Sequence, residues 1–477
     1  MENQTRTRTP ARKQQHVVIV PSPGMGHLIP LAEFAKLLHD NHPFSITILL
    51  PTTTPPTAAQ TSYLSTLPPA ISYTFLPQVD PTHLPTTPVA HEVIITLALL
   101  HSATHVRDAL NELTRRTHVV ALVTDLFGTV LFEVAREVGV LPYLYFTSTA
   151  MCLGLLLHLP VLDETVSCEY RDMVEPVVLP GCVPLHGKDF MDPAQDRKNE
   201  AYKAILDHVK KYNSAEGIFI NTFTDLEPGV IHALQNNEYS GPHSIYPVGP
   251  IIQSGLSDDS DDSDCLSWLD RQQPGSVLFV SFGSGGTLTY EQLNELALGL
   301  EQSGQKFLWV VRSPSNVSHG SFFSGASQDD PFGFLPNGYL ERIKDHGLLV
   351  PSWAPQIKVL GHGSTGGFLS HCGWNSTLES IVNGVPIIAW PLYAEQKMNA
   401  VMLSDGLKVA LRVRANEGGV VEAGEIATVV RELMVGEEGK RIHQRMNELR
   451  DLAKKARSED GESTKLLNQV VLKWSSE

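Results

Sequence analysis

The segment from residue 353 to residue 396 combines side chains that could bind a planar base, a phosphate group and a sugar. Its apolar run at 366–370 predicts a buried strand, which ends in the turn 371–373 before a helical pattern begins at Asn375. The first turn of a helix favours phosphate because its backbone N–H groups and its dipole both attract an anion. The pattern therefore predicts a phosphate site here, with His371 as a further donor; the alternatives are a plain N-cap and a satisfied turn histidine.

Other side chains in the same segment could bind a nucleoside and a sugar. Glu379 lies one turn after Ser376 on the same helix face, so its carboxylate can accept hydrogen bonds from ribose hydroxyls. Trp353 follows an apolar run, which places its indole at a strand end where it can stack on a base. Glu395 and Gln396 follow another buried run and offer acceptors and donors to adjacent sugar hydroxyls.

His27 and Asp125 are the candidate catalytic residues. His27 follows the expected strand 17–20, and Asp125 follows the expected strand 119–124. Both positions then lie at the carboxyl ends of strands, where open α/β sheets bind their ligands. A neutral imidazole can take the proton of a hydroxyl, and a carboxylate on its other nitrogen fixes the tautomer. The alternative for His27 is a structural role beside Gly26.

Two glycine-rich turns could bind phosphate groups. The turn around Gly24 and Gly26 lacks the third glycine of a dinucleotide fingerprint, and the expected strand 45–50 ends without an acidic residue for a ribose, which disfavours a dehydrogenase. The turn 283–287 offers backbone N–H groups and the Ser284 hydroxyl, which suit a diphosphate. An ordinary tight turn is the alternative reading of this second segment.

Composition limits the possible ligands and partners. A chain of 477 residues is long enough for two domains, each with its own core. Its 52 acidic and 36 basic residues give a net charge of −16, which argues against nucleic acid or an anionic membrane as a partner. Five widely spaced cysteines support neither a disulfide framework nor a zinc site, so a reducing cytosol fits best.

Short apolar runs alternate with helical patterns along the chain, which predicts two doubly wound α/β domains. None of these runs approaches the roughly 20 apolar residues that span a bilayer, so no membrane insertion is expected. The first sixteen residues are basic and lack an apolar segment, which favours a disordered tail, with a transit peptide as the alternative. The expected strands are 17–20, 45–50, 71–76, 119–124, 142–146, 217–220 and 246–248, then 277–282, 307–311, 348–350, 367–370, 386–390 and 409–413.

A low-complexity acidic run at 254–264 is expected to be a linker. Its Asp262 and Asp264 could be taken for the metal-binding Asp-x-Asp of metal-dependent glycosyltransferases. A metal site needs a rigid surrounding shell, which such a run does not offer, so we predict no metal site.

The segment 353–396 resembles, from its first residue to its last, the nucleotide-sugar signature of plant family 1 UDP-dependent glycosyltransferases. Its motifs are Trp-Ala-Pro-Gln, His-Cys-Gly-Trp-Asn-Ser-Thr-Leu-Glu-Ser and Pro-Leu-Tyr-Ala-Glu-Gln. The resemblance implies that Trp353 stacks on uracil, that Glu379 holds the ribose and that Glu395 and Gln396 bind the hexose. It assigns the diphosphate to His371, Asn375 and Ser376, and it adds to the donor site Ser284, Ala354, Gln356 and Trp374.

The resemblance extends over nearly the whole chain, and segments 21–30, 159–168 and 281–289 look most like the hydroquinone glucosyltransferase (arbutin synthase) branch. It implies two Rossmann-like domains facing across a cleft, the GT-B architecture. It also implies an inverting transfer of glucose from UDP-glucose to small hydroxylated aromatics in plant secondary metabolism, with His27 as base and Asp125 as its support. No cofactor or metal is expected, with UDP-glucose as co-substrate, and we predict a cytoplasmic monomer.

The domain boundaries expected on this basis are a tail at 1–16, an acceptor-binding domain at 17–250, the linker at 251–264 and a UDP-sugar-binding domain at 265–455. Residues 456–477 are expected to form a helix that packs back on the first domain.

Four residues are candidates for contact with the acceptor. Phe127 is close to Asp125 in sequence and Phe146 ends an expected strand, so both could line an aromatic wall, with core packing as the alternative. Glu92 precedes the apolar run 93–95 and is a candidate polar contact, with a solvated helix start as the alternative. Tyr393 completes the acceptor set.

Two other classes of protein are weighed against a transferase. A glycosidase or other hydrolase would need two opposed carboxylates or an activated nucleophile, and the chain has no Gly-x-Ser-x-Gly elbow. A catalytically silent nucleotide-sugar-binding protein would not require both His27 and Asp125.

Overall fold

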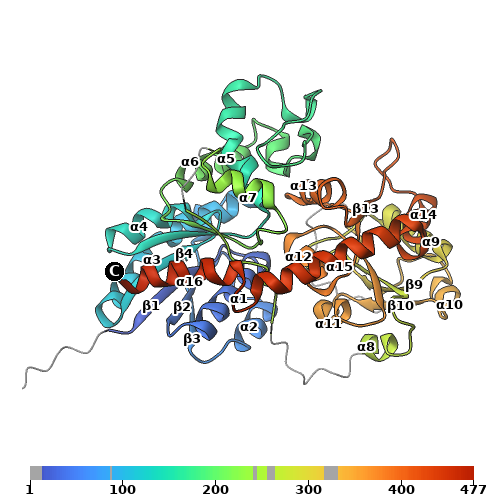
Figure 1. The fold of residues 1–477 in the computed structure, drawn as a ribbon, viewed down its shortest axis with the longest axis horizontal. Coiled ribbons are helices and arrows are strands. Elements are labelled where there is room, and N and C mark those ends of the chain that lie inside the picture. Colours follow the sequence, from blue (N-terminus) through green and yellow to red (C-terminus); the bar gives the residue numbers. More distant parts are fainter. Residues whose placement is uncertain (1–12, 86–88, 240–243, 255–263, 316–330, 477) are drawn as a thin grey trace, which may run out of the picture. The chain divides into compact units, whose positions relative to one another are not determined.

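The computed structural model describes residues 13–85, 89–239, 244–254, 264–315 and 331–476, and in them the chain forms two sheets (Figure 1). Each of the expected strands is present. The first sheet contains β1 (Gln15–Val20), β2 (Ser45–Leu50), β3 (Ile71–Phe75), β4 (His118–Thr124), β5 (Leu141–Phe146), β6 (Ile218–Ile220) and β7 (Ile245–Pro247). The second contains β8 (Val277–Ser281), β9 (Lys306–Val311), β10 (Gly347–Pro351), β11 (Thr365–Ser370), β12 (Ile387–Ala389) and β13 (Ala410–Arg412).

Most strands form as expected because their apolar runs are buried nearly throughout, as in β1 and β8, whereas β3 and β10 at the sheet edges are more exposed. The sheet orders are β3-β2-β1-β4-β5-β6-β7 and β10-β9-β8-β11-β12-β13. In both, the central pairs are parallel, and the order reverses beside the first strand, between β1 and β4 and between β8 and β11. The prediction of two doubly wound domains is therefore confirmed.

Helices connect the strands, and glycine and threonine residues set several of their ends. The Thr289 side chain accepts a hydrogen bond from the Gln292 N–H at the start of α9, and Gly304 ends that helix in the left-handed conformation. The helices are α1 (Met25–Asn41), α2 (Ala58–Ser65), α3 (His91–Arg116), α4 (Leu131–Glu137), α5 (Ala150–Thr165), α6 (Glu200–Tyr212), α7 (Pro228–Gln235), α8 (Asp264–Leu269), α9 (Tyr290–Ser303), α10 (Tyr339–Ile343), α11 (Gln356–Leu360), α12 (Trp374–Asn383), α13 (Gln396–Val401), α14 (Ala423–Val435), α15 (Glu437–Arg457) and α16 (Glu462–Ser476).

The chain separates into two compact units. The first contains residues up to Tyr145, Lys210–Phe219 and residues from Leu467 on, and the second contains Phe146–Val209 and Ile220–Leu466. The expected domain boundaries stay predictions, with one correction. The expected tail 1–16 is two residues too long, since β1 begins at Gln15 and His16 is buried in the sheet.

Two expected features fall on residues that are not described. Most of the expected acidic linker, residues 255–263, lies outside the described residues, and so does Asp262 of the Asp-x-Asp motif. Asp264 is described and begins α8.

The C-terminal helix α16 contributes a large side chain to the core of the first unit. Trp474 is fully buried, and its ring contacts those of Phe44, Tyr143 and Phe219 edge-on at centroid distances of 5.7, 5.3 and 6.1 Å. Gln15 of β1 also donates a hydrogen bond to the Trp474 carbonyl at 3.2 Å. The end of the chain is thereby part of the core that supports β1.

Trp474→Ala should lower the free energy of unfolding by about 3–5 kcal/mol, because it removes a buried aromatic side chain and leaves a cavity. Chemical denaturation measures the change. Leu472→Ala on the same helix is the control, since Leu472 is 69% exposed. Equal losses for the two variants would contradict the packing role of Trp474.

Candidate functional site

The loop after β1 and the loop after β4 bring His27 and Asp125 together. Val20 and Thr124 are paired at the ends of these strands, so the chain leaves the sheet at the same level on both. His27 lies in the first turn of α1, and its Nδ1 is 3.0 Å from Asp125 Oδ2. The His27 side chain is 21% exposed and the Asp125 side chain is fully buried, so the imidazole remains accessible while its carboxylate partner is shielded.

Several donors keep the buried Asp125 ionised. Burial alone would raise the pKa of Asp125, but the charge and hydrogen bond of His27 and two hydrogen bonds from Ser22 hold it below its usual value. Ser22 donates to Asp125 through its backbone N–H at 2.8 Å and through its hydroxyl at 2.5 Å. An ionised Asp125 holds the proton of His27 on Nδ1, so Nε2 is the basic nitrogen.

Ser22 was not predicted from the sequence. The available signal was its place directly after β1, in the loop that carries His27.

Phe127 lies beside His27 and Asp125. Its ring meets that of His27 edge-on at 5.7 Å, and its backbone N–H donates to Asp125 Oδ1 at 3.3 Å. Glu92 lies in the first turn of α3, in the same compact unit. The expected acceptor contacts of Phe127 and Glu92 stay predictions.

In the second unit, the loops after β8 and β11 hold the imidazole of His371 between two glycines. Ser281 and Ser370 are paired at the ends of these strands. A Cβ atom on Gly283 would lie 2.6 Å from His371 Nε2, and one on Gly373 would lie 2.5 Å from it, so any side chain at either position would displace the ring. Gly283 also has a φ of +75°, which favours glycine there.

His371 is a neutral, buried donor or acceptor. Burial lowers its pKa to about 4, so the ring is uncharged at neutral pH. Among the described residues, no group hydrogen-bonds to its buried Nδ1 atom. A buried polar atom without a partner is uncommon, so this nitrogen is a candidate to bond a ligand.

The helix α12 begins next to His371, as the sequence predicts. Gly373 is its N-cap, so the alternative that Asn375 is merely the N-cap is wrong. Asn375 and Ser376 lie in the first turn, where backbone N–H groups and the helix dipole favour an anion. The indole of Trp374 donates to the Asn221 carbonyl at 2.7 Å, which anchors the start of the helix.

Gln356 joins the two α12 side chains expected to bind diphosphate and ribose. Its amide nitrogen donates to Ser376 Oγ at 2.9 Å and to Glu379 Oε2 at 2.7 Å. Burial raises the pKa of Glu379 to about 7, while the hydrogen bond from Gln356 opposes that change. Glu379 is therefore poised between its neutral and charged forms near neutral pH.

The remaining expected donor residues differ in exposure. Trp353 follows β10 and is 65% exposed, so its indole presents an open face to a planar ligand, while Ala354 is buried. Ser284 is exposed in the turn after β8.

The expected hexose residues lie at the start of α13 and are held by local hydrogen bonds. Glu395 Oε1 accepts from the Ser148 hydroxyl at 3.0 Å and from the Asn399 amide at 3.4 Å. Gln396 Oε1 accepts from the backbone N–H groups of Leu392 and Tyr393 at 2.9 and 3.0 Å. The Gln396 oxygen thus holds its own loop, so its amide nitrogen is the group that could donate to a sugar hydroxyl.

A segment distant in sequence also supports this loop. The Asp192 carboxylate accepts from the Ala394 backbone N–H at 2.8 Å, and the Asp192 N–H donates to the Ala394 carbonyl at 3.1 Å. Ala394 has a φ of +54°, which these two bonds help to hold. Sequence analysis missed Ser148 and Asp192 because no motif connects them to residues 395 and 396.

Two expected acceptor residues lie in the second unit. Phe146 is 1% exposed at the end of β5, which fits its alternative role in core packing. The Tyr393 ring lies 6.4 Å from that of His371, and burial raises the pKa of Tyr393 to about 12, so its hydroxyl stays protonated. Their contacts with an acceptor stay predictions.

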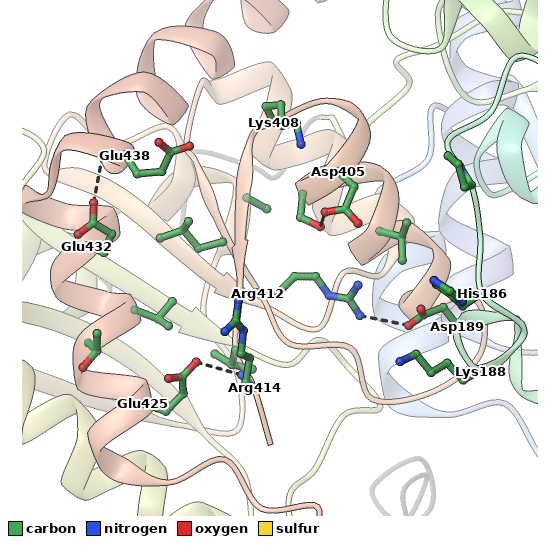
Figure 2. A pocket seen from close by; sticks show the side chains of 18 residues that line it. His186, Lys188, Asp189, Asp405, Lys408, Arg412, Arg414, Glu425, Glu432 and Glu438 are labelled. Carbon is green, nitrogen blue, oxygen red and sulfur yellow. Dashed lines mark hydrogen bonds and ion pairs between the residues drawn. The ribbon is translucent and has the colours of Figure 1, made fainter. Parts of the chain in front are cut away.

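Figure 2 shows a cavity of about 810 Å³ in the second unit that none of the expected site residues lines. Its walls carry both signs of charge, and several of these groups already interact. Arg412 donates to Asp189 at 3.2 Å, and the Arg414 backbone N–H donates to Glu425 at 3.2 Å. A diphosphate would meet acidic groups here, so this cavity does not suit the donor.

The described ranges contain neither a metal-binding cluster nor a membrane-spanning helix. No group of three or more His, Cys, Asp or Glu side chains in them could hold a metal ion. No helix in them combines the length and the apolar character needed to cross a bilayer.

Comparison with known proteins identifies relatives along nearly the whole chain. The family described as UDP-glucoronosyl and UDP-glucosyl transferase matches residues 213–444. A hydroquinone glucosyltransferase of Rauvolfia serpentina is 56% identical over 462 residues, which are 97% of this chain and 98% of that protein.

Solved structures give the same result. Phytolacca americana UGT2 complexed with UDP-2fluoro-glucose and pterostilbene has a TM-score of 0.89 and 64% identity, covering 98% of this chain and 100% of that chain. A UDP-glucosyltransferase from Polygonum tinctorium capable of glucosylating indoxyl, in complex with 3,4-dichloroaniline, has a TM-score of 0.91 and 50% identity, with coverage of 98% and 100%.

Gly283→Ala should weaken the binding of UDP, because the new methyl group would push His371 out of its place between the two glycines. Isothermal titration calorimetry with UDP measures the loss, which we expect to be about tenfold, the effect of one charge-assisted hydrogen bond.

Gly304→Ala is the matched control. Its φ of +66° imposes similar backbone strain, but nothing lies within 4 Å of an added Cβ atom. Equal UDP affinities in the two variants would show that the contact with His371 has no part in binding.

Proposed function

The chain belongs to the UDP-dependent glycosyltransferases, and on this premise we propose that it transfers glucose from UDP-glucose to the hydroxyl group of a small aromatic acceptor with inversion. The resemblance drawn from the sequence is thereby confirmed, and the chain is an enzyme of the UDP-glucosyltransferase type. The single observation that carries the proposed chemistry is the short contact between the accessible His27 and the buried, ionised Asp125.

We propose that His27 is the general base. Its Nε2 takes the proton of the acceptor hydroxyl, whose oxygen forms a bond to C1 of glucose as the bond from C1 to the β-phosphate oxygen breaks. UDP leaves with that electron pair, and a single displacement converts the α-linked donor into a β-glucoside. Asp125 is a positioning residue that fixes the tautomer and stabilises the imidazolium, and such catalysis contributes about 10²–10⁴-fold.

We propose that the second unit binds the donor. The exposed indole of Trp353 stacks on uracil, and Glu379, oriented by Gln356, accepts from the ribose. The first turn of α12 offers donors to the diphosphate, and so does His371 Nδ1, which bonds to no described residue. Glu395 and Gln396 bind the hexose, with Glu395 oriented by Ser148. These local donors offset the net charge of −16, which would otherwise repel the diphosphate.

The proposed acceptor is a compact hydroxylated aromatic such as a phenol. Phe127 beside His27 offers an aromatic edge to a planar ligand. The relatives point the same way, since one is named for hydroquinone and another is capable of glucosylating indoxyl. We further propose a cytoplasmic monomer that needs no cofactor or metal, because neutral donors and a helix start serve the diphosphate.

Incubation of the purified protein with UDP-glucose and a panel of phenols tests the proposed function. We expect UDP release coupled to a β-glucoside, detected by mass spectrometry and by the anomeric proton coupling, and unchanged by excess EDTA. Release of glucose without a phenol would indicate a hydrolase, UDP binding without turnover would indicate a silent binding protein, and loss of activity in EDTA would contradict metal independence.

His27→Ala should abolish transfer to weakly acidic phenols, because no other base is held by Asp125, while the affinity for UDP stays near that of the wild type. Steady-state kinetics and UDP calorimetry separate these two effects. We expect kcat to fall by about 10²–10⁴-fold.

Asp125→Asn is the companion variant. It should lower kcat less than His27→Ala does, since the imidazole remains but loses the carboxylate that orients it. Turnover of a phenol by His27→Ala at the wild-type rate would contradict the base assignment.

A further inference from the structure

Arg312 is a cation at the donor site that the family signature does not include. It directly follows the last residue of β9, next to β8 in the second sheet. Its Nη1 donates to the carbonyl oxygen of Gly283 at 3.3 Å. Gly283 is the residue that packs against His371, so the guanidinium lies at the turn that borders the expected diphosphate site.

The guanidinium is partly buried, and no carboxylate in the described part of the chain acts as its counter-ion. Burial lowers the pKa of Arg312 from its usual value, while electrostatic interaction with Tyr393 acts in the opposite direction. Among the described residues, no Asp or Glu forms an ion pair or a hydrogen bond with it. Other arginines of the second unit do have such partners, as Arg412 has with Asp189 and Arg342 with Glu301. A partly buried charge without an opposite charge is costly, which suggests that a ligand supplies the anion.

The neighbours of Arg312 indicate which anion this is. Gly283 belongs to the turn after β8, and Tyr393 lies beside His371 and two residues before Glu395. The phosphate-binding and hexose-binding loops therefore both lie close to this cation. The proposed donor would place its diphosphate here, and the planar fork of a guanidinium can bind a phosphate group through two hydrogen bonds, which an ammonium group cannot match.

We propose that Arg312 is the counter-ion of the donor's diphosphate and stabilises the negative charge that develops on UDP as the glycosidic bond breaks. This inference rests on the proposed function and adds a residue outside the signature to its donor site. His371 is neutral and the α12 start carries only partial charges, so Arg312 supplies the one full positive charge of this set. Such a charge acts most strongly in the transition state, where the leaving group gains an electron pair.

Comparing UDP with uridine tests the proposal, because uridine lacks the diphosphate but keeps the base and the ribose. Calorimetry on Arg312→Gln should show UDP affinity reduced by about tenfold or more, the effect of losing a charge-assisted hydrogen bond, with uridine affinity unchanged. The UDP affinity of Arg312→Lys should lie between those of the wild type and Arg312→Gln, since lysine keeps the charge but loses the planar fork. The value of kcat should likewise be highest in the wild type, lower in Arg312→Lys and lowest in Arg312→Gln.

Arg414→Gln is the control for loss of a cation from the same unit, since Arg414 lies in the wall of the cavity in Figure 2 and has an exposed side chain. Its ratio of UDP affinity to uridine affinity should equal that of the wild type. If Arg312→Gln does not fold, Arg312→Lys decides the question by the same ratio.

A wild-type ratio in every Arg312 variant that folds would overturn the inference and leave the proposed function intact. Equal loss of UDP and uridine affinity would also overturn it, since that result indicates a structural role for the arginine. A wild-type protein that binds UDP no better than uridine would instead contradict the proposed function itself.

Discussion

The reversal of strand order beside the first strand of each sheet positions both the pair of His27 and Asp125 and the pair of Gly283 and His371. Parallel strands at such a point send their following loops to opposite sides of the sheet, which leaves a crevice at their carboxyl ends. In the first sheet these loops follow β1 and β4 and carry His27 and Asp125. In the second they follow β8 and β11 and carry Gly283 and His371. The same arrangement thus positions the base that we propose in one sheet and the anion site that we propose in the other.

Burial and hydrogen-bond partners set the charge states of Asp125 in the first sheet and of His371 in the second. Asp125 is buried yet stays ionised because Ser22 and His27 donate to it. Burial keeps His371 neutral, and within the described ranges its Nδ1 bonds to no other group. The ionised Asp125 favours His27 as a proton acceptor, whereas the buried nitrogen of His371 favours a ligand with acceptor atoms. This difference in hydrogen bonding, rather than the residue type, separates the two roles that we propose for these histidines.

The fold could be predicted, and residues for a donor site could be proposed, because their signals are local. Most strands are short buried apolar runs, and the segment 353–396 carries its groups on consecutive elements, from Trp353 after β10 to Gln396 in α13. The errors and omissions have a different origin. The tail expected from the sequence includes Gln15 and His16, because polar residues at the end of a strand carry no apolar signal. Asn375 was weighed as an N-cap, but a glycine can take that position when no side chain is needed to bond the first turn.

The sequence by itself determined the alternation of strands and helices and the family resemblance, and it supplied the residues that we propose as the base, its carboxylate partner and the donor contacts. Only the tertiary structure revealed the partners that orient them: Ser22 for Asp125, Ser148 for Glu395, and Arg312 for the turn at Gly283. Local patterns follow from propensity and periodicity, which act over a few residues. The other contacts join segments 29 to 247 residues apart, and such contacts exist only once the sheets have formed and brought the loops together.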